Sequence, residues 1–362
     1  MKIRMLPSLA LALLASTASA QSSLGTANSF NVFVFGTGTA NSGEAEGAVA
    51  AGGTLTLNGY NTTILSNEMG VVGGLTKSDN STGTLNHVSI YAGGAFNYSS
   101  VNVNSSGNAY VHGNLNAGNQ SNFNGGGKLY SDKTGVYPAG YSYAVDPSVF
   151  SNQQSFSLVQ SSQLSTSAST TNAAFQVVDQ NSWTFDASTQ TGSVKYVSVD
   201  AATLGSLQGT TLRLLNLKDT DTLVINVTGS HLSQTFFSLS NDKHNNYFAN
   251  VLWNFASTDA NAEFDISQRA FDGSLLAPSA LVDQNQLFEG NLIANNWVGH
   301  GYEDHLRDNF KFNGVLSTAS AVPEPGNLAM AGGLLLGGLG FLACRGKRLG
   351  RGGLAVQCSK RS

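Results

Sequence analysis

Cysteine is nearly absent from this chain, and charged residues are scarce. Both cysteines, Cys344 and Cys358, lie close to the C-terminus, so the remainder has no thiol nucleophile and no disulfide. Only 11% of the residues are Asp, Glu, Lys or Arg. A chain this poor in charge and rich in Asn, Ser, Thr and Gly is either disordered or built from short strands and turns. Its regular alternation of apolar and polar residues favours strands.

Positive charge is depleted between the two ends of the chain. Eight of the 18 Lys and Arg residues lie in the end segments, which leaves ten against all 22 Asp and Glu residues, a net formal charge of −12. Because nucleic-acid binding needs a basic surface, this balance excludes a nucleic-acid partner. An acidic surface suits solubility outside the cell and weak cation binding.

The N-terminus has the pattern of a secretory signal peptide. Two basic residues precede an apolar stretch over residues 5–14, and small residues follow. The sequence predicts a signal peptide over residues 1–20, export through the Sec translocon, and cleavage at a site formed by Ala18, Ala20 and Gln21.

Three features follow one another at the C-terminus. The motif Val322, Pro323, Glu324 and Pro325 precedes an uncharged apolar run over 327–344, and the basic residues Arg345, Lys347 and Arg348 come next. A run of about 18 residues is at the short end of what crosses a bilayer as a helix. Basic residues beyond it favour a cytoplasmic end.

This order resembles the PEP-CTERM sorting signal of Gram-negative bacteria. The resemblance implies a linker with the motif over 321–326, a transmembrane helix over 327–344 and a cytoplasmic tail over 345–362. It also implies cleavage by an exosortase in the inner membrane, then transfer to the cell surface or extracellular matrix. The alternative is an ordinary single-span anchor.

Short glycine-containing segments recur in the first part of the chain. Four of them end at residues 53, 74, 94 and 114, at steps of 21, 20 and 20. A period near 20 with Gly or Asn at corners is typical of one coil of a β-solenoid. Two later segments, 272–278 and 289–295, repeat at a step of 17 and predict two more stacked coils.

A helix is expected between these coils. Asp146-Pro147 is a typical helix start, with apolar residues at helical spacing after it, and strand patterns return beyond residue 175. The predicted fold is therefore mainly β over residues 21–320. It is a parallel β-helix-like solenoid with coils over 44–145, one long flanking α-helix over about 147–170, and strands and coils over 175–316.

Five motifs, in their order along the chain, resemble the choice-of-anchor A family of secreted bacterial domains, which are regarded as adhesins. They are Phe30–Gly36, Glu46–Gly53, Asn250–Phe255, Gly273–Pro278, and Glu303 with His305. The resemblance implies a surface-sorted structural or adhesive protein that acts in the extracellular matrix or in attachment. The alternative is a polysaccharide-binding module or a carbohydrate-active enzyme on the same solenoid.

Carboxylates and imidazoles are densest near the end of the predicted domain. Such a cluster could contact a sugar or bind a divalent cation such as Ca²⁺. Its spacing is not that of the zinc motif His-Glu-x-x-His, so no zinc site is predicted. Apart from this candidate Ca²⁺ ion, no cofactor is predicted. The alternative is a polar loop that ends the solenoid. The candidate residues are His300, Glu303, Asp304, His305 and Asp308.

Other polar and aromatic residues receive simpler interpretations. Asp219 and Asp221 are expected in a turn before a strand, and Glu44 and Glu46 in solvent. No Ser nucleophile motif is present, so we expect no enzyme. Aromatic residues among the Asn-rich coils bind carbohydrate if they point outward and form core if they point inward; they are Tyr60, Tyr91, Phe96, Tyr98, Tyr110, Phe123 and Tyr130.

The signal peptide and the sorting signal predict one cleavage each. We expect the native protein at the cell surface or in the matrix to start at Gln21 and end near Pro325. Replacement of Pro323, Glu324 and Pro325 by Ala removes the exosortase motif and abolishes this form. Intact mass after cell fractionation measures both ends, and a membrane form that keeps Ser362 in wild type and variant alike contradicts sorting.

Overall fold

The structure is a computed structural model of the chain. It describes residues 23–118, 121–168, 176–179, 182–207, 211–234, 237–240, 247–306 and 310–316. The predicted signal peptide, sorting motif, apolar run and basic tail lie outside the described residues. Within these ranges, no helix combines the length and the hydropathy that a membrane span requires.

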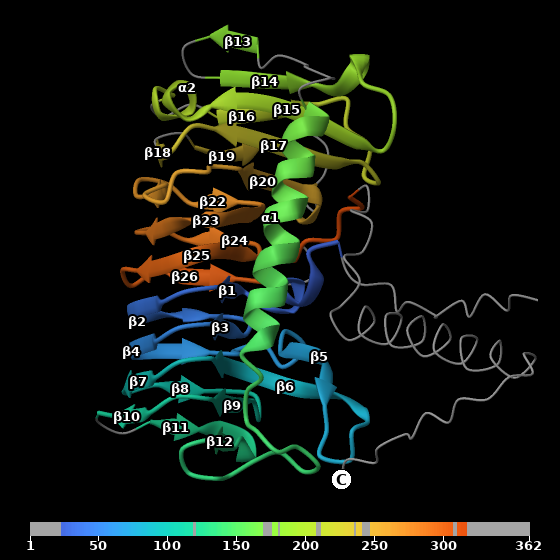
Figure 1. Ribbon diagram of the computed structural model, residues 1–362. Coiled ribbons are helices and arrows are strands. Elements are labelled where there is room, and N and C mark those ends of the chain that lie inside the picture. The colour runs from blue at the N-terminus through green and yellow to red at the C-terminus, as the bar shows by residue number, and fades with distance from the viewer. Residues whose placement is uncertain are drawn as a thin grey trace, which may run out of the picture. The chain divides into compact units, whose positions relative to one another are not determined.

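The first half of the chain builds the lower part of the unit as drawn in Figure 1. Its elements are η1 (Gly25–Ser29), β1 (Val32–Val34), β2 (Gly38–Ala45), β3 (Val49–Ala51), β4 (Leu55–Thr62), β5 (Gly70–Thr76), β6 (Thr82–Ala92), β7 (Phe96–Ser99), β8 (Asn102–Val103), β9 (Asn108–Val111), β10 (Leu115–Ala117), β11 (Asn122–Phe123), η2 (Asn124–Gly126) and β12 (Leu129–Ser131).

The long helix α1 (Ser148–Ala168) then leads to the upper part. There the elements are β13 (Gln176–Asp179), β14 (Ser182–Asp186), η3 (Ala187–Thr189), β15 (Val194–Asp200), α2 (Ala201–Gly205), β16 (Thr211–Leu215), β17 (Thr222–Thr228), β18 (His231–Ser233), β19 (Phe237–Ser240), η4 (Tyr247–Asn250), β20 (Val251–Phe255), β21 (Glu263–Ile266), β22 (Phe271–Asp272), β23 (Ser274–Gln284), β24 (Phe288–Glu289), β25 (Leu292–Gly299) and β26 (Glu303–His305).

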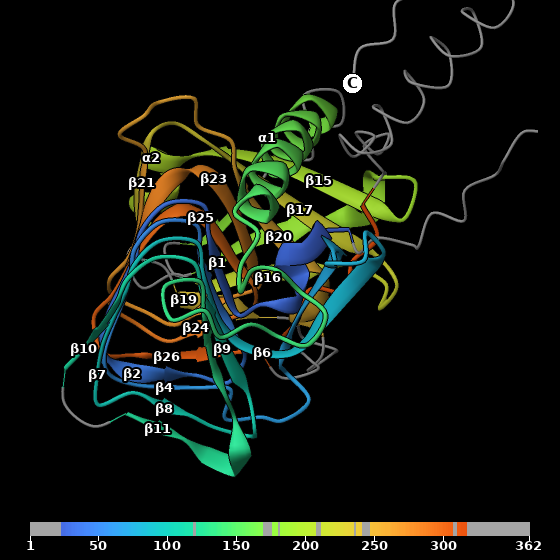
Figure 2. The same ribbon diagram turned by 60° about the horizontal axis from the view of Figure 1, so that its bottom comes forward.

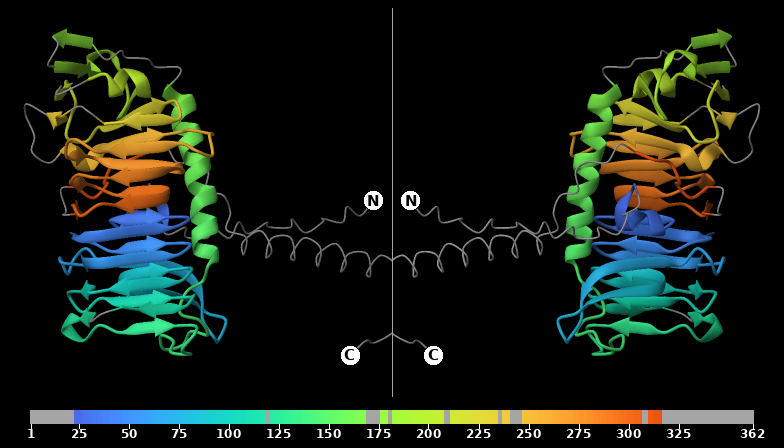
Figure 3. Two further views of the ribbon diagram at one scale, coloured as in Figure 1. Left: turned by 90° about the vertical axis from the view of Figure 1, so that its left-hand side faces the viewer. Right: turned by 90° about the vertical axis from the view of Figure 1, so that its right-hand side faces the viewer.

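Ten parallel strands form the side of the solenoid that α1 covers. Their order is β12–β9–β6–β3–β1–β25–β23–β20–β17–β15. The first strand of the chain thus lies in the middle of the stack, between β3 and the late strand β25. The chain winds downward from β1, returns along α1, and winds downward again until its last coil meets its first (Figures 1 and 3).

Two further sides complete each coil. One side has the order β18–β21–β23–β25–β2–β4–β7–β10. The other has the order β22–β24–β26–β2–β4–β8–β11. Strands β2 and β4 therefore contribute to both of these sides. A separate four-stranded sheet, β13–β14–β16–β19, lies at the upper end.

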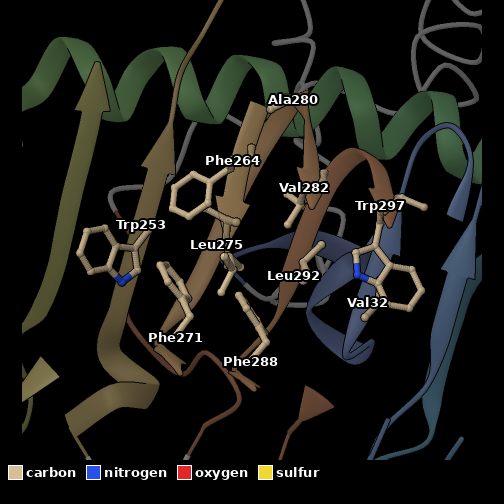
Figure 4. Packing of buried hydrophobic residues seen from close by; sticks show 14 of the residues in the cluster. Val32, Trp253, Phe264, Phe271, Leu275, Ala280, Val282, Phe288, Leu292 and Trp297 are labelled. Atoms are coloured by element: carbon tan, nitrogen blue, oxygen red, sulfur yellow. The ribbon is translucent and has the colours of Figure 1, made fainter. Parts of the chain in front are cut away.

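Inward-pointing side chains of successive coils stack on one another inside the solenoid. Phe271 and Phe288 stack with ring centroids 5.3 Å apart, and Trp253 lies 5.2 Å from Phe271 (Figure 4). Burial of each large apolar side chain contributes about 2–3 kcal/mol relative to exposure. A second cluster fills the space under α1, where Phe150 packs 5.2 Å from Phe33 and 5.5 Å from Tyr91.

The predicted solenoid, helix and late coils are confirmed within the described residues. Leu275 pairs with Leu292 and Ala277 with Ala294, which is the predicted step of 17. Asp146 Oδ1 accepts a hydrogen bond from Ser148 N at 2.9 Å, as expected at the start of the helix. The register between β23 and β25 shifts between Ala277 and Leu281, and this stretch contains Pro278, which has no backbone N–H to donate.

One predicted early coil is wrong. Residues 70–74 belong to β5, which pairs antiparallel with β6 as a hairpin, and β3 pairs directly with β6. The stacking step there is therefore 41 residues, from Val49 to Ile90. A short apolar segment ending in glycines has the same local pattern in a hairpin as in a coil. Only the pairing partner distinguishes the two.

Glycine is required where successive coils touch backbone to backbone. A Cβ on Gly113 would lie 2.4 Å from the carbonyl carbon of Gly94, whereas a Cβ on the exposed Gly73 would meet nothing closer than 3.7 Å. Because backbone atoms cannot move aside cheaply, we expect Gly113→Ala to lower the free energy of unfolding by about 2 kcal/mol. Gly73→Ala, the matched control, should change it by less than about 0.5 kcal/mol. Equal urea midpoints for the two variants would contradict this stacking.

Candidate functional site

Asparagine side chains form ladders on the outside of the lower coils. On one side Asn97 Nδ2 donates to Thr56 Oγ1 at 3.0 Å, and Asn116 Nδ2 donates to Asn97 Oδ1 at 2.7 Å. On the next side Asn102 Nδ2 donates to Asn61 Oδ1 at 2.8 Å, and Asn122 Nδ2 donates to Asn102 Oδ1 at 3.0 Å.

These ladders follow from the parallel register of the coils. Asn97 lies opposite Thr56 on one strand and Asn116 on the other. Neighbouring strands are about 4.8 Å apart, which suits hydrogen bonds between like amides because each has a donor and an acceptor. A third ladder joins Asn124 Nδ2 to Asn104 Oδ1 at 2.9 Å. The result is a fixed, uncharged array of amide groups along the solenoid axis.

The corresponding columns carry charge on the upper coils. His231 Nδ1 lies 3.4 Å from Glu263 Oε2, and Asp265 Oδ2 accepts a hydrogen bond from Ser233 Oγ at 3.0 Å. His300 Nε2 lies 2.9 Å from Asp283 Oδ1. Along these columns the outer side chains therefore change from carboxylates and imidazoles on the upper coils to neutral amides on the lower coils.

His305 is the centre of an acidic cluster between the first and last coils. Its Nε2 lies 2.9 Å from Glu303 Oε2 and its Nδ1 lies 3.5 Å from Glu289 Oε1. Glu46 Oε1 lies 4.0 Å from His305 Nε2, and its other carboxylate oxygen accepts from Leu306 N at 3.1 Å. This cluster thus joins β26 to the turn after β2.

The structure brings together only part of the predicted cluster. Glu303 and His305 point to the same side, His300 pairs elsewhere with Asp283, and Asp308 lies outside the described residues. Over the ranges that the structure describes, no group of three or more His, Cys, Asp or Glu side chains is arranged to hold a metal ion. Partial burial, followed by the charge of Glu303, raises the pKa of the nearby Glu44.

Asp304 points into the core, because side chains alternate along β26. Its Oδ2 accepts a hydrogen bond from Tyr60 Oη and its Oδ1 accepts one from Gln284 Nε2, both at 2.8 Å. Trp297 Nε1 donates to Gln284 Oε1 at 2.8 Å. Burial raises the pKa of Asp304 to about 7, although these hydrogen bonds and His305 act in the opposite direction. Asp304 is therefore part of a buried polar network.

Several expectations for single residues change with the structure. The segment expected as a polar loop contains the stacked strand β26, and Glu46, expected in solvent, is buried. Asp221 does lie in the turn predicted before β17, where its backbone N donates to Lys218 O at 2.9 Å.

The seven aromatic residues considered for carbohydrate stacking belong to the core. Tyr60, Tyr91, Phe96 and Tyr110 are buried, and Tyr98, Phe123 and Tyr130 are partly buried against the core clusters. Of the two orientations that the sequence left open, the inward one therefore holds for these residues. The outward positions of the same coils carry Asn, and its recurrence at equivalent positions of successive coils is a signal that sequence reasoning missed.

The protonated state of Asp304 predicts a dependence of stability on pH. An unfolded Asp has a pKa of about 3.9, so between about pH 4 and 7 the folded state keeps a proton that the unfolded state releases. The free energy of unfolding should therefore fall as pH rises through this window, by at most about 4 kcal/mol.

Asp304→Asn tests this contribution because the amide has the same shape and cannot ionise. We expect the variant to fold and to show a flatter stability profile than the wild type in urea titrations from pH 4 to 7. Asp259→Asn, in an exposed turn, controls for the removal of a carboxyl group. An unchanged pH slope in Asp304→Asn would rule out Asp304 as its source.

The chain is similar to one protein family and to two solved structures. A family model described as "Putative Ice-binding-like adhesive domain" matches residues 23–306. An ice-binding protein from an Antarctic biological consortium is 14% identical, with 83% of this chain and 94% of that chain covered and a TM-score of 0.30. A glycosylated ice-binding protein from an Arctic yeast is 9% identical, with 84% and 98% covered and a TM-score of 0.27. No curated protein matches. Since the family model spans almost the whole solenoid, this chain belongs to the ice-binding-like adhesive domain family.

Proposed function

We propose that this protein is a surface adhesin whose lower asparagine ladders bind a neutral, hydroxyl-rich polymer such as an extracellular polysaccharide. Membership of an adhesive, non-enzymatic family implies an extracellular or surface location. The observation that supports the ligand class is the row of hydrogen-bonded amides from Thr56 through Asn97 to Asn116.

The ladders have the chemistry that such a polymer requires. Each amide nitrogen has two hydrogens, so Asn97 keeps one for a ligand after its bond to Thr56. The side chains of Asn97 and Asn102 are held by their neighbours, which lowers the entropy lost on binding. Repetition at about 4.8 Å along the axis offers a long chain many weak contacts at once, and many contacts together give avidity.

Export and sorting belong to this proposal. The signal peptide over 1–20, the motif at Val322, Pro323, Glu324 and Pro325, and the resemblance to choice-of-anchor A domains support secretion and exosortase processing. Transient passage through the inner membrane would then deliver the solenoid to the cell surface or matrix. This delivery is consistent with membership of an adhesive family, because an adhesive domain acts at the cell surface.

Two other functions receive less support. The alternative of a carbohydrate-active enzyme is not carried forward, because the family is adhesive. An ice-binding face needs Thr at equivalent positions of successive coils. Thr39 lies beside Thr56, but Asn97 and Asn116 continue that column, so the Thr array ends after two coils.

Asn97→Asp tests the ladder by replacing one side-chain NH2 group with an oxygen atom. It adds a negative charge and removes the amide donors, so we expect affinity for an immobilised neutral β-glucan or galactomannan to fall at least about tenfold. Asn261→Asp makes the same change at an exposed position in an upper turn and should bind as the wild type does. Equal retention of both variants, or no binding of the wild type to any neutral polysaccharide tested, contradicts the proposal.

A further inference from the structure

The lowest coil of the solenoid has an edge on which no further strand is stacked. Strands β10, β11 and β12 each pair with one parallel strand on the upper side, namely β7, β8 and β9. Among the described residues their other side has only an isolated antiparallel bridge, between Ser131 and Val136. Unpaired backbone N–H and C=O groups along a strand edge are a template for pairing with another chain.

The asparagine ladders also end with open acceptors at this edge. Asn116, Asn122 and Asn124 all donate Nδ2 to the coil above, and all three are exposed. Within the described part of the chain, the Oδ1 atoms of these three residues accept no hydrogen bond. Three apolar residues of the same coil, Leu115, Phe123 and Leu129, remain only partly buried where they pack on the core. Both the polar and the apolar groups of this end would be satisfied by one more layer of strands.

The distribution of charge indicates which molecule supplies this additional layer of strands. Lys128 is the single Asp, Glu, Lys or Arg among residues 108–131, whereas the segment between the two sorting signals carries a net formal charge of −12. Two copies of this acidic chain repel each other over most of their surface. This repulsion is smallest at the nearly neutral lower end. A second copy therefore binds there more readily than at other parts of the surface.

We propose that two copies of this chain pair through their lower ends, about a two-fold axis perpendicular to the solenoid axis. Strands β10, β11 and β12 lie on three different sides of the solenoid (Figure 2). If the two-fold axis passes through the side that contains β11, the β11 strands of the two copies pair with each other in antiparallel orientation. The same operation sets β10 of one copy against β12 of the other. Such an isologous contact closes after two copies and does not grow into a fibre.

Pairing doubles the adhesive surface. The ladder that ends at Asn122 on β11 would continue into the same ladder of the second copy, and a polymer that spans both copies would dissociate more slowly than from one copy. This consequence rests on the proposed polymer binding, whereas the pairing itself does not.

The pairing is tested by sedimentation velocity. The sample is the native protein after processing by its host. We expect a dimer for the wild type and a monomer for the double variant Asn116→Lys, Asn122→Lys. The charges added at position 122 of the two copies face each other across the axis, and those added at position 116 lie on the same joined edge and increase the repulsion. Such repulsion should raise the dissociation constant of the dimer on the order of 100-fold. The matched control Thr258→Lys, Asn261→Lys adds the same charge in an upper exposed turn and should remain dimeric. Unchanged far-UV circular dichroism excludes misfolding of either variant.

Cross-linking locates the contact. Asn122→Cys should give a covalent dimer with a short bismaleimide, and Asn261→Cys should not, while any background from Cys344 and Cys358 is equal in both. A monomeric wild type at tens of micromolar, equal dimerisation of the two Lys variants, or assemblies larger than a dimer would each overturn the proposal. A monomer that still binds polysaccharide would overturn the pairing alone and leave the adhesive function standing.

Discussion

The parallel pairing of β1 between β3 and β25 is the contact on which the rest of the solenoid depends. A coil cannot bury its own edges, so each needs a neighbour on both sides. Here the neighbour on one side comes from nearly 260 residues later in the chain, with Val32 opposite Leu292. Further hydrogen bonds reinforce this junction. The side chain of Asn291 donates through Nδ2 to Phe30 O at 2.7 Å, and the backbone N of Leu292 donates to Asn31 O at 2.8 Å.

Alternation along the stacked strands then separates core from surface. Inward positions build columns of aromatic and aliphatic side chains, and outward positions on the lower coils build columns of Asn and Thr. Asp304 departs from this rule, but its hydrogen bonds to Tyr60 and Gln284 satisfy the buried carboxyl group. The same regular register thus produces both the stability of the solenoid and its repeating polar surface.

The adhesive assignment and the surface chemistry agree with each other. Adhesion to a polymer benefits from a long, rigid and repetitive surface more than from a deep pocket. In the proposed polymer binding the neutral ladders on the lower coils would provide such a surface, while carboxylate–imidazole pairs such as Asp283 with His300 occupy the upper coils. The acidic cluster around His305 contributes to the junction between first and last coils.

The sequence alone determined what depends on neighbours along the chain. The helix start at Asp146, the step of 17 between the late coils and the alternation of strands are local patterns, and each is confirmed. The tertiary structure decided what depends on pairing between distant segments. The hairpin β5–β6 lengthens one step to 41 residues, which conceals the column from Asn61 to Asn102. The insertion of β1 beside β25 was not foreseen because the paired residues, such as Val32 and Leu292, lie far apart in the sequence. The direction of Asp304 was equally undetermined, because alternation fixes which residues share a face but only packing decides which face is the core.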